Sequence, residues 1–390
     1  MTAAPPRHAI QIVTLFWALL PAAIPSHACP FCGTLSQSLA QRRDQAALVC
    51  IGEALPPARR DAAGLLVEQF RLLQELPRPA LATGPADSLP ADEICARVTA
   101  PLAGTALLFA TAAGDGGIGD WEALAADEVL LGYAVAAPPT SQSSAIRLTW
   151  FAARLEHRQP AIAEDAFAEF AGAPFPQVCE VAAALSKQPL VDWVAAPGVD
   201  QRRRGFYGLA LGIVAAAGLP ADRPLTSAAL YASLSADGGD FRWGTDGLMA
   251  GILVADGSAG LDWLLARVRA DRPVDHRHLL AALRFAWEFL ADSLPRERVA
   301  RATAILARSP AVAADAVIDL ARYAAWNDLD TVAGLWDSCG QDDPLIRRAV
   351  AGYLDACPLP AARSHLDRIG KLDPASLARA RAAAALPLGN

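Results

Sequence analysis

The chain has 390 residues, of which 53% are hydrophobic and 19% charged, and its net charge is −7. This length allows one or two sizeable hydrophobic cores, and the low content of charged residues excludes wholesale disorder. The negative charge excludes a general nucleic-acid-binding protein, because such a protein needs a cationic surface that displaces counterions from phosphates. We therefore expect a folded protein whose partners are not nucleic acids.

The amino terminus has the pattern of a secretory signal peptide. A short basic region precedes a largely apolar stretch from Ile10 to Ile24, and small residues then precede a predicted cleavage site between Ala28 and Cys29. The apolar stretch is too short to span a bilayer comfortably. We therefore predict that residues 1–28 are a signal peptide and that the mature chain is exported, to the periplasm, the cell envelope or the medium, without an integral membrane span. The alternatives are a retained anchor and a lipoprotein that is acylated on Cys29.

The predicted mature chain begins with the letters "CPFC", which bring Cys29 and Cys32 close together. Such a pair can act in thiol redox chemistry, contribute to a zinc site or form structural disulfides. No strand precedes the pair, as one does in thioredoxin-like sites, and no second close pair supports a zinc site. Since exported chains meet oxidising conditions, we predict structural disulfides among Cys29, Cys32, Cys50 and Cys95, one of them joining the amino-terminal pair to Cys95.

Residues 29–137 contain short segments typical of β-strands, separated by turns rich in glycine and proline. One of these segments, which begins at Gly64, also has the apolar spacing of a helix. Several short strands within about 90 residues are typical of a small barrel of the OB type. We therefore predict an OB-type β-domain over these residues. The four predicted strand segments begin at Ala46, Gly64, Asp92 and Thr105.

Beyond a predicted linker at residues 138–144, the pattern becomes helical and repeats from residue 145 to residue 385. Three segments share one layout, in which a proline begins a helix and a β-branched residue follows two positions later. Two of these prolines are 34 residues apart, a period that indicates stacked helix pairs. We therefore predict an all-α solenoid, followed by a tail at residues 386–390. The three prolines are Pro160, Pro310 and Pro344.

Parts of the sequence resemble known families. The segment "DPLIRRAV", from Asp343, resembles the HEAT repeat. The paired cysteines, followed by "AALVCIGEA" and "PLAGTALLFA", resemble the netrin-type modules of metalloproteinase inhibitors. That resemblance implies an OB barrel whose first segment is tied by a disulfide to a later strand. It also implies an inhibitor whose first cysteine, here Cys29, chelates a protease zinc, although the inhibitors have Cys-x-Cys where this chain has Cys-x-x-Cys.

The order of the parts also resembles exported proteins of planctomycete-type bacteria. The segments "EHRQPAIAEDAFAEFAGAPF", "RRRGFYGLALG" and "DGLMAGIL" carry this resemblance, which covers most of the mature chain. It implies an amino-terminal "CPFC", a netrin- or OB-like module and HEAT-like helical repeats. It implies no activity.

Three clusters of polar residues have both a functional and a structural interpretation. Arg202, Arg203 and Arg204 could clamp an anion or an acidic peptide, because guanidinium groups bind carboxylates with two hydrogen bonds, or they could be a solvated turn at a helix start. We interpret the acidic residues of "EDAFAEF" as surface charge. His276 and His278 diverge on a helix, so we expect exposed or capping side chains that do not share a metal ion.

The sequence contains no motif that identifies an enzyme or a cofactor site. Nucleophile-elbow, zinc-protease and phosphate-loop motifs are absent, and we interpret "GDGGIG", from Gly114, as a barrel turn because no acidic residue follows at the distance that dinucleotide binding requires. We therefore predict no cofactor, no metal and no enzyme activity. We expect most tryptophans to fill the core between helices and a minority to anchor a peptide on the binding face.

We predict a binding or scaffold protein whose solenoid surface binds a protein or peptide. Two alternatives use the amino-terminal cysteines instead. One is a metalloprotease-inhibitor-like protein that acts through the Cys29 segment. The other is a thiol oxidoreductase that uses Cys29 and Cys32 as a redox pair.

Overall fold

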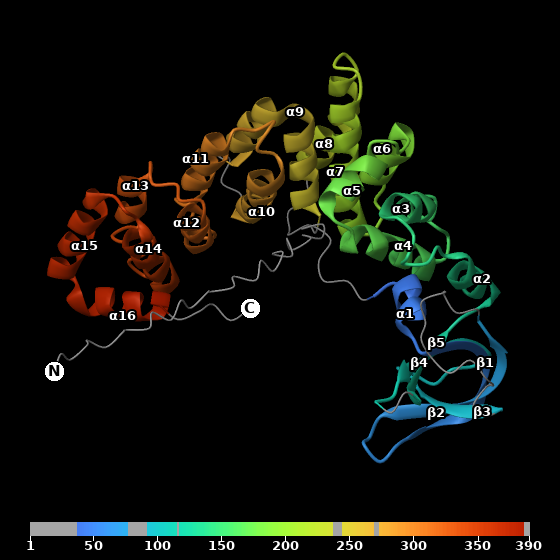
Figure 1. Ribbon diagram of the computed structural model, residues 1–390. Coiled ribbons are helices and arrows are strands. Elements are labelled where there is room, and N and C mark those ends of the chain that lie inside the picture. Colours follow the sequence, from blue (N-terminus) through green and yellow to red (C-terminus); the bar gives the residue numbers. More distant parts are fainter. Residues whose placement is uncertain (1–36, 77–91, 115–116, 237–243, 269–272, 386–390) are drawn as a thin grey trace, which may run out of the picture.

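The computed structural model describes residues 37–76, 92–114, 117–236, 244–268 and 273–385. These residues form a five-stranded β-barrel at one end and a curved row of helices that extends away from it (Figure 1). The predicted architecture, a small OB-type barrel followed by a HEAT-like α-solenoid, is confirmed. The predicted signal peptide lies outside the described residues, as do Cys29 and Cys32.

The barrel closes in the strand order β1-β2-β3-β5-β4. The β3–β5 pair is parallel, and every other neighbouring pair is antiparallel. The strands are β1 Leu48–Arg60, β2 Leu66–Glu75, β3 Glu93–Arg97, β4 Thr105–Ala112 and β5 Ile118–Ala125.

The period of burial explains why the ambiguous second segment forms a strand. Along β2 the side chains of Glu68 and Phe70 are buried, whereas those of Gln69 and Arg71 are exposed. This alternation suits a strand, because successive side chains of a strand point to opposite faces. β5 is a strand that the sequence did not predict, because it follows directly on the glycine-rich stretch that turns the chain back from β4. The interior is filled mainly by Leu48, Cys50, Phe70, Leu108 and Trp121.

A short helix precedes the barrel and another follows it. They are α1, Leu39–Gln45, and α2, Glu128–Ala136. The buried guanidinium of Arg43 donates to the carbonyl oxygens of Ala134 and Ala137 at 2.9 and 2.8 Å, at the carboxyl end of α2. These carbonyls have no partner within the helix, so Arg43 caps α2. The two chain segments that enter and leave the barrel are thereby tied together.

The remaining helices follow one another along the row, and neighbours in sequence pack in pairs (Figure 1). α4 and α14 begin at Pro160 and Pro344, as predicted. The third predicted start, at Pro310, was wrong: hydrogen-bonded turns occupy residues 309–312, and the helix begins at Ala313. The helices are α3 Ser144–Ala152, α4 Pro160–Gly172, α5 Phe175–Ala182, α6 Lys187–Ala195, α7 Gln201–Ala217, α8 Arg223–Ser235, α9 Thr245–Val268, α10 Pro273–Phe289, α11 Arg296–Leu306, α12 Ala313–Arg322, α13 Leu329–Gly334, α14 Pro344–Ala356, α15 Pro360–Leu372 and α16 Pro374–Ala385.

Helices α7 and α9 make the closest contact in the row, because glycines on both let their backbones meet. A Cβ added at Gly212 would lie 2.6 Å from Gly251 Cα, and one at Gly247 would lie 2.8 Å from Gly205 Cα. Real Cβ atoms do not approach other atoms so closely, so only glycine fits at these positions. The contact therefore joins α7, which carries Gly205 and Gly212, to α9, which carries Gly247 and Gly251.

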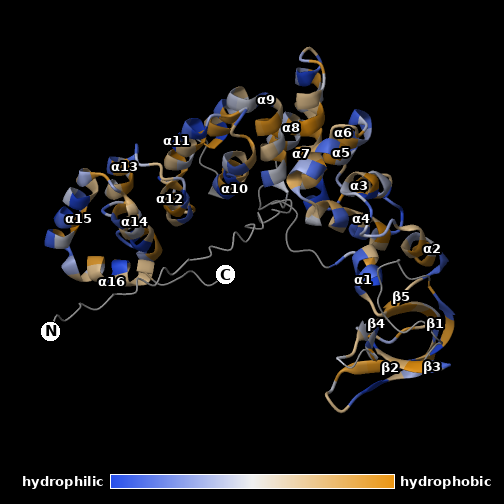
Figure 2. Cartoon of the chain, viewed as in Figure 1, coloured by the Kyte–Doolittle hydropathy of each residue, from blue (hydrophilic) through white to orange (hydrophobic). Residues whose placement is uncertain are grey.

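α9 is the helix in the described part of the chain that is long and apolar enough to cross a membrane by length and composition alone. In the structure, 56% of its most apolar window is buried inside the molecule. Figure 2 shows that apolar residues also mark its neighbour α7 and the strands of the barrel. The apolar character of α9 therefore matches its place at the centre of the helical row.

Candidate functional site

The three predicted binding arginines do not point to a common site. Arg203 is buried, with Nε 2.9 Å from Glu156 and Nη1 2.5 Å from Glu164, so its charge is neutralised within the protein. Consecutive helical residues point about 100° apart, which separates Arg203 from Arg202 and Arg204. The sequence had no signal for the two acidic partners, which belong to segments far earlier in the chain.

The two flanking arginines also differ from each other. Arg204 donates from Nη2 to the carbonyl oxygen of Ala196 at 2.6 Å and, more weakly, to that of Val199 at 3.4 Å. Arg202 is exposed. One guanidinium of the three is therefore available to a partner on the surface, and the arrangement resembles a helix start fastened to the preceding loop.

Two of the predicted disulfide cysteines lie in the barrel, and they do not bond to each other. Cys50 points into the barrel, whereas Cys95 is exposed on β3. Cys50 lies opposite Glu75 of β2, and Cys95 lies opposite Gln69 of the same strand. Six residues of a strand extend about 20 Å, which is far beyond the Cα separation that a disulfide allows.

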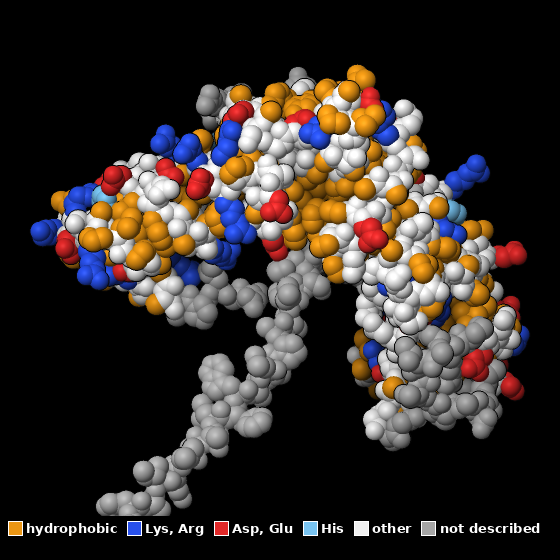
Figure 3. All heavy atoms as spheres, turned by 45° about the horizontal axis from the view of Figure 1, so that its top comes forward, with side chains coloured by type: hydrophobic (Ala, Val, Ile, Leu, Met, Phe, Trp, Pro, Cys, Tyr) orange, Lys and Arg blue, Asp and Glu red, His pale blue; other side chains and the backbone are white. Residues whose placement is uncertain are grey.

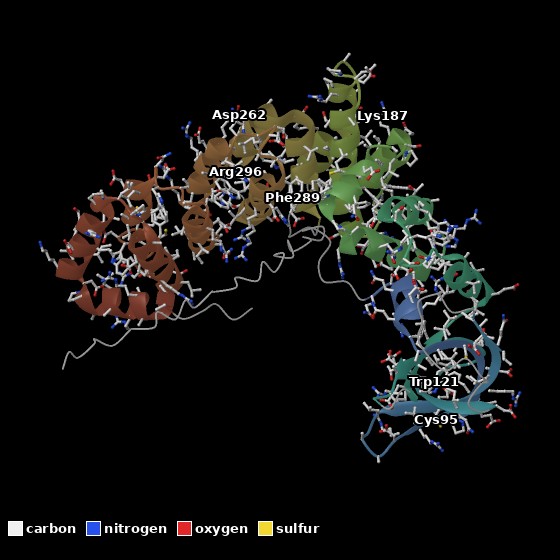
Figure 4. All side chains as sticks on the ribbon, in the orientation of Figure 1. Cys95, Trp121, Lys187, Asp262, Phe289 and Arg296 are labelled. Atoms are coloured by element: carbon white, nitrogen blue, oxygen red, sulfur yellow. The ribbon has the colours of Figure 1, made fainter. Side chains whose placement is uncertain are left out.

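Cys95 therefore remains as the barrel thiol that could meet an amino-terminal cysteine. Its Sγ accepts a hydrogen bond of 3.5 Å from Nη2 of Arg59, and Cys95, Trp121 and their neighbours line a surface cavity of about 410 Å³ (Figure 4). Arg97 lines this cavity and also a second cavity. The lining of the second cavity includes Gln37, the first described residue. Cys29 and Cys32, the other two predicted disulfide cysteines, lie outside the described residues.

The interpretation of the acidic helix α4 as surface charge was wrong for two of its residues. Glu169 is buried, and it accepts hydrogen bonds from Ser38 Oγ and, at 2.5 Å, from Arg147 Nη2. Asp165 accepts the backbone N–H of Leu39 at 2.6 Å. Both carboxylates thus fasten the start of α1 to α4. Burial raises the pKa of each carboxyl above its usual value.

His276 and His278 were expected to be exposed or capping, and the structure shows capping for His276 and exposure for neither. His276 and His278 are both buried. His276 contacts Ser309 Oγ through Nδ1 at 2.7 Å and the carbonyl oxygen of Val268 through Nε2 at 3.2 Å. Since Val268 ends α9, this histidine caps one helix and fastens it to the turn before another. Its arrangement is that of a structural link.

A groove near the middle of the helical row combines aromatic and charged side chains. Arg296, which lines it, is labelled in Figure 4. Its volume is about 510 Å³. It is formed by the end of α10, the start of α11, the connection between α12 and α13, and the residue before α15. We call it the Trp287 groove, and it is lined by Trp287, Arg296, Glu297, Ala300, Arg301, Tyr323, Ala324, Ala325, Trp326, Asn327, Asp328 and Leu359.

Stacked aromatic rings form one side of the Trp287 groove. The rings of Trp287 and Tyr323 lie 3.9 Å apart, with an angle of 15° between their planes. Trp326 packs against Tyr353 with a centroid distance of 4.9 Å. Each of these aromatic side chains is held by another ring, so it loses little conformational entropy when a partner binds.

The connection between α12 and α13 fixes the backbone of the groove. Ala324 has a φ of 51°, a left-handed conformation that is costly for a residue with a Cβ. The N–H of Ala325 donates to Leu320 at 3.0 Å, and the carbonyl oxygen of Ala325 accepts the hydroxyl of Tyr353 at 2.7 Å. The surrounding hydrogen bonds therefore impose this conformation and hold Trp326 in the groove.

Charged side chains of both signs line the groove. The guanidinium of Arg296 lies 5.2 Å from the centre of the Trp287 ring, and Arg301 follows five residues later on α11. The carboxylates of Glu297 and Asp328 line the groove as well. Tryptophan, tyrosine and arginine are the residue types that contribute most binding energy in protein interfaces, so this arrangement is typical of a binding site.

The sequence predicted part of this arrangement. A minority of the tryptophans was expected on the binding face, and Trp287 and Trp326 lie in the groove, whereas Trp336 is buried in the core. Which tryptophans would be exposed could not be read from the sequence, because it does not show which distant segments pack over each ring.

Comparisons of this chain with protein-family models, with curated proteins and with solved structures find no match.

Proposed function

We propose that the protein is an exported binding or scaffold protein that holds a protein or peptide partner in the Trp287 groove. The observation that carries the proposal is the pair of tryptophans, fixed by neighbouring rings, at the edge of a cavity with exposed arginines. The row of paired helices supports it, because such rows present extended surfaces to partners. The predicted signal peptide supports export.

A photo-crosslinking residue in place of Ala300 tests the groove, because Ala300 lines it and is only partly buried. In the native envelope it should form a discrete crosslinked species. Trp326→Leu should remove that species while keeping an apolar contact with Tyr353. Trp263→Leu is the matched control, since Trp263 is also partly buried and packs on a tyrosine, Tyr231, outside the groove.

Two outcomes of this experiment would contradict the proposal. One is the same crosslinked species in the wild type and in Trp326→Leu. The other is an equal loss in Trp326→Leu and Trp263→Leu, which would indicate a general effect on folding. Circular dichroism spectra of the variants would show whether each retains its helices.

We also propose that an amino-terminal cysteine pairs with Cys95 in the exported protein. Cys95 is exposed, and it lines one surface cavity. Gln37, the first described residue, lines a second cavity that shares Arg97 with the first. Gln37 lies five positions after Cys32, and an extended chain of that length reaches about 17 Å. In the chain-entropy model, closing a loop of about 60 residues contributes about 4 kcal/mol to stability.

Peptide mapping of the non-reduced exported protein checks this pairing. The expected result is a peptide that contains Cys95 linked to one that contains Cys29 or Cys32. Free, readily alkylated thiols at Cys29 and Cys32 would contradict it and favour the oxidoreductase alternative. The inhibitor alternative stays a prediction, and it requires that one residue added before Cys29 abolish inhibition.

A further inference from the structure

We infer that the segment bound in the Trp287 groove carries a carboxylate next to an apolar side chain. This inference rests on the proposed function, and it adds the chemical class of the partner. It follows from how charge is distributed around the groove, from which charges are already compensated, and from the position of the aromatic rings.

The part of the chain that forms α10, α11 and the turn after them is basic, whereas the whole chain has a net charge of −7. Residues 273–308 contain six arginines and four acidic residues. In Figure 3, basic side chains are frequent on the carboxyl-terminal half of the helical row, at the left of the view. The arginines are Arg277, Arg284, Arg296, Arg298, Arg301 and Arg308, and the acidic residues are Asp275, Glu288, Asp292 and Glu297.

The arginines outside the groove and those inside it differ in their partners. Arg284 lies 2.5 Å from Asp319, and Arg298 lies 2.5 Å from Asp262. Among the described residues, Arg296 and Arg301 form no ion pair with a carboxylate. Arg296 is instead held over a tryptophan ring, which leaves its hydrogen-bonding edge available.

The two carboxylates of the groove lie at helix starts, where the helix dipole offsets part of their charge. Glu297 lies in the first turn of α11, and Asp328 is the residue before α13. The positive end of a helix dipole stabilises an acidic side chain at such positions. Arg296 is the first residue of α11, so the same dipole adds to its positive potential. The two guanidinium groups and the positive ends of the helices together exceed the charge of the two carboxylates, so the net potential of the groove is positive and favours an anion.

The aromatic side of the groove selects what accompanies the anion. Trp287, Tyr323 and Trp326 offer apolar surface, and Leu359 on the same groove is 43% exposed. An apolar side chain that covers these residues would exclude water from the two guanidinium groups. Charge-assisted hydrogen bonds strengthen when water is excluded, so the apolar and anionic contacts would support each other. A free anion lacks the first contact, and we therefore assign the site to a peptide.

Binding of a defined peptide set tests the inference. The probes are fluorescein-labelled, end-capped hexapeptides with tryptophan or leucine at the third position and glutamate, glutamine or lysine at the positions around it. Fluorescence anisotropy with the full mature protein should show that glutamate peptides bind at least tenfold more tightly than their glutamine counterparts. A hydrogen-bonded pair of charges accounts for a difference of that size.

Two arginine variants test whether the preference for glutamate comes from the Trp287 groove. Arg301→Gln should reduce the preference for glutamate to less than about threefold, whereas Arg308→Gln should keep it, because Arg308 is also exposed but does not line the groove. Inorganic phosphate at 10-fold the peptide concentration should not displace the peptide.

Several outcomes would overturn the inference. They are equal binding of glutamate and glutamine peptides, no binding of any peptide, the same loss in both arginine variants, and displacement by phosphate, which would indicate a simple anion site. The crosslinking experiment with Trp326→Leu does not depend on these peptides. The proposed function can therefore hold even if this inference fails.

Discussion

Two contacts between helices hold distant parts of this molecule together by opposite means. Between α7 and α9, glycines on both helices bring backbone against backbone, and the neighbouring side chains are apolar. Between α1 and α4, two carboxylates on α4 accept hydrogen bonds from the first residues of α1. The first contact depends on volume alone, and the second depends on hydrogen bonds and on the charge of buried groups.

The difference predicts how each contact fails. A contact between backbones has no side chain that can move aside, so an added methyl group must push the helices apart. A buried polar contact tolerates small changes in volume, but it leaves a charge unpaired when one partner is removed. Each contact should therefore be sensitive to a substitution that the other tolerates.

Glu169→Ala should have the largest effect. It leaves the guanidinium of Arg147 partly buried without its carboxylate, and breaking a buried pair in this way costs about 3 kcal/mol. Hydrogen exchange measured by mass spectrometry should show this loss as a lower free energy of opening for α3 and α4, which carry the pair, and also for α1, which loses its hydrogen bond to Glu169. Glu164→Ala, on the same helix, is the control: its side chain is 50% exposed, and we expect a loss below about 1 kcal/mol. Equal effects of the two substitutions would contradict the role of Glu169.

Gly212→Ala should destabilise the other contact by about 2–3 kcal/mol, since the added Cβ would lie 2.6 Å from Gly251 Cα. Exchange should accelerate in both α7 and α9 and remain unchanged in α1. Gly132→Ala in the exposed face of α2 is the matched control, because a Cβ there has open space around it. In that helix alanine is favoured over glycine, so we expect a gain of about 0.5–1 kcal/mol. A neutral Gly212→Ala would mean that the helices separate at little cost.

The sequence predicted those parts of the fold whose signals are local. β2 alternates in burial, β4 is a short apolar run with a turn before and after it, and helices α4 and α14 begin at prolines, so short stretches were sufficient to identify them. β5 was not predicted, because the residues at its start are glycine-rich and typical of a turn. α1 and α2 were not predicted either, because they are short and lie in a region whose other segments are strands.

The contacts that join distant segments could not be predicted in the same way. Glu169 and its partner Ser38 are 131 residues apart, and the letters "EDAFAEF" are equally typical of a solvated helix face. The Trp287 groove brings together four segments of the helical half, and its arginines differ in no local feature from the many others. A helix start that contains Arg202, Arg203 and Arg204 was easier to notice, yet its charge is partly used within the protein.

Ser38→Ala should have a smaller effect on the polar contact, of about 1 kcal/mol. The substitution removes the hydrogen bond to Glu169 and also the cap that Ser38 forms at the start of α1, where it accepts the N–H of Gln41 at 3.1 Å. Ser143→Ala, which precedes α3, is the matched control because Ser143 makes no such side-chain cap. Exchange in α1 should accelerate in Ser38→Ala, while exchange in α3 should be unchanged in the control. No change in α1 would mean that the hydrogen bond from the Leu39 N–H to Asp165 is sufficient to hold α1 on α4.

The smallest expected effect is that of pH on the polar contact. Burial raises the native pKa of Glu169 and Asp165 above the usual values of 4.5 and 3.8, so the folded protein binds these protons more readily than the unfolded chain. The stability that these groups contribute is therefore full below the usual values, and it is lost as the pH rises through the raised ones. Glu169→Gln cannot titrate. The difference in opening free energy between the wild type and Glu169→Gln should shift in favour of the wild type as the pH falls from 7.5 towards 5. A shift in the other direction would mean that the nearby Arg147 and Arg42 outweigh burial, and the contact would then resemble an ordinary ion pair.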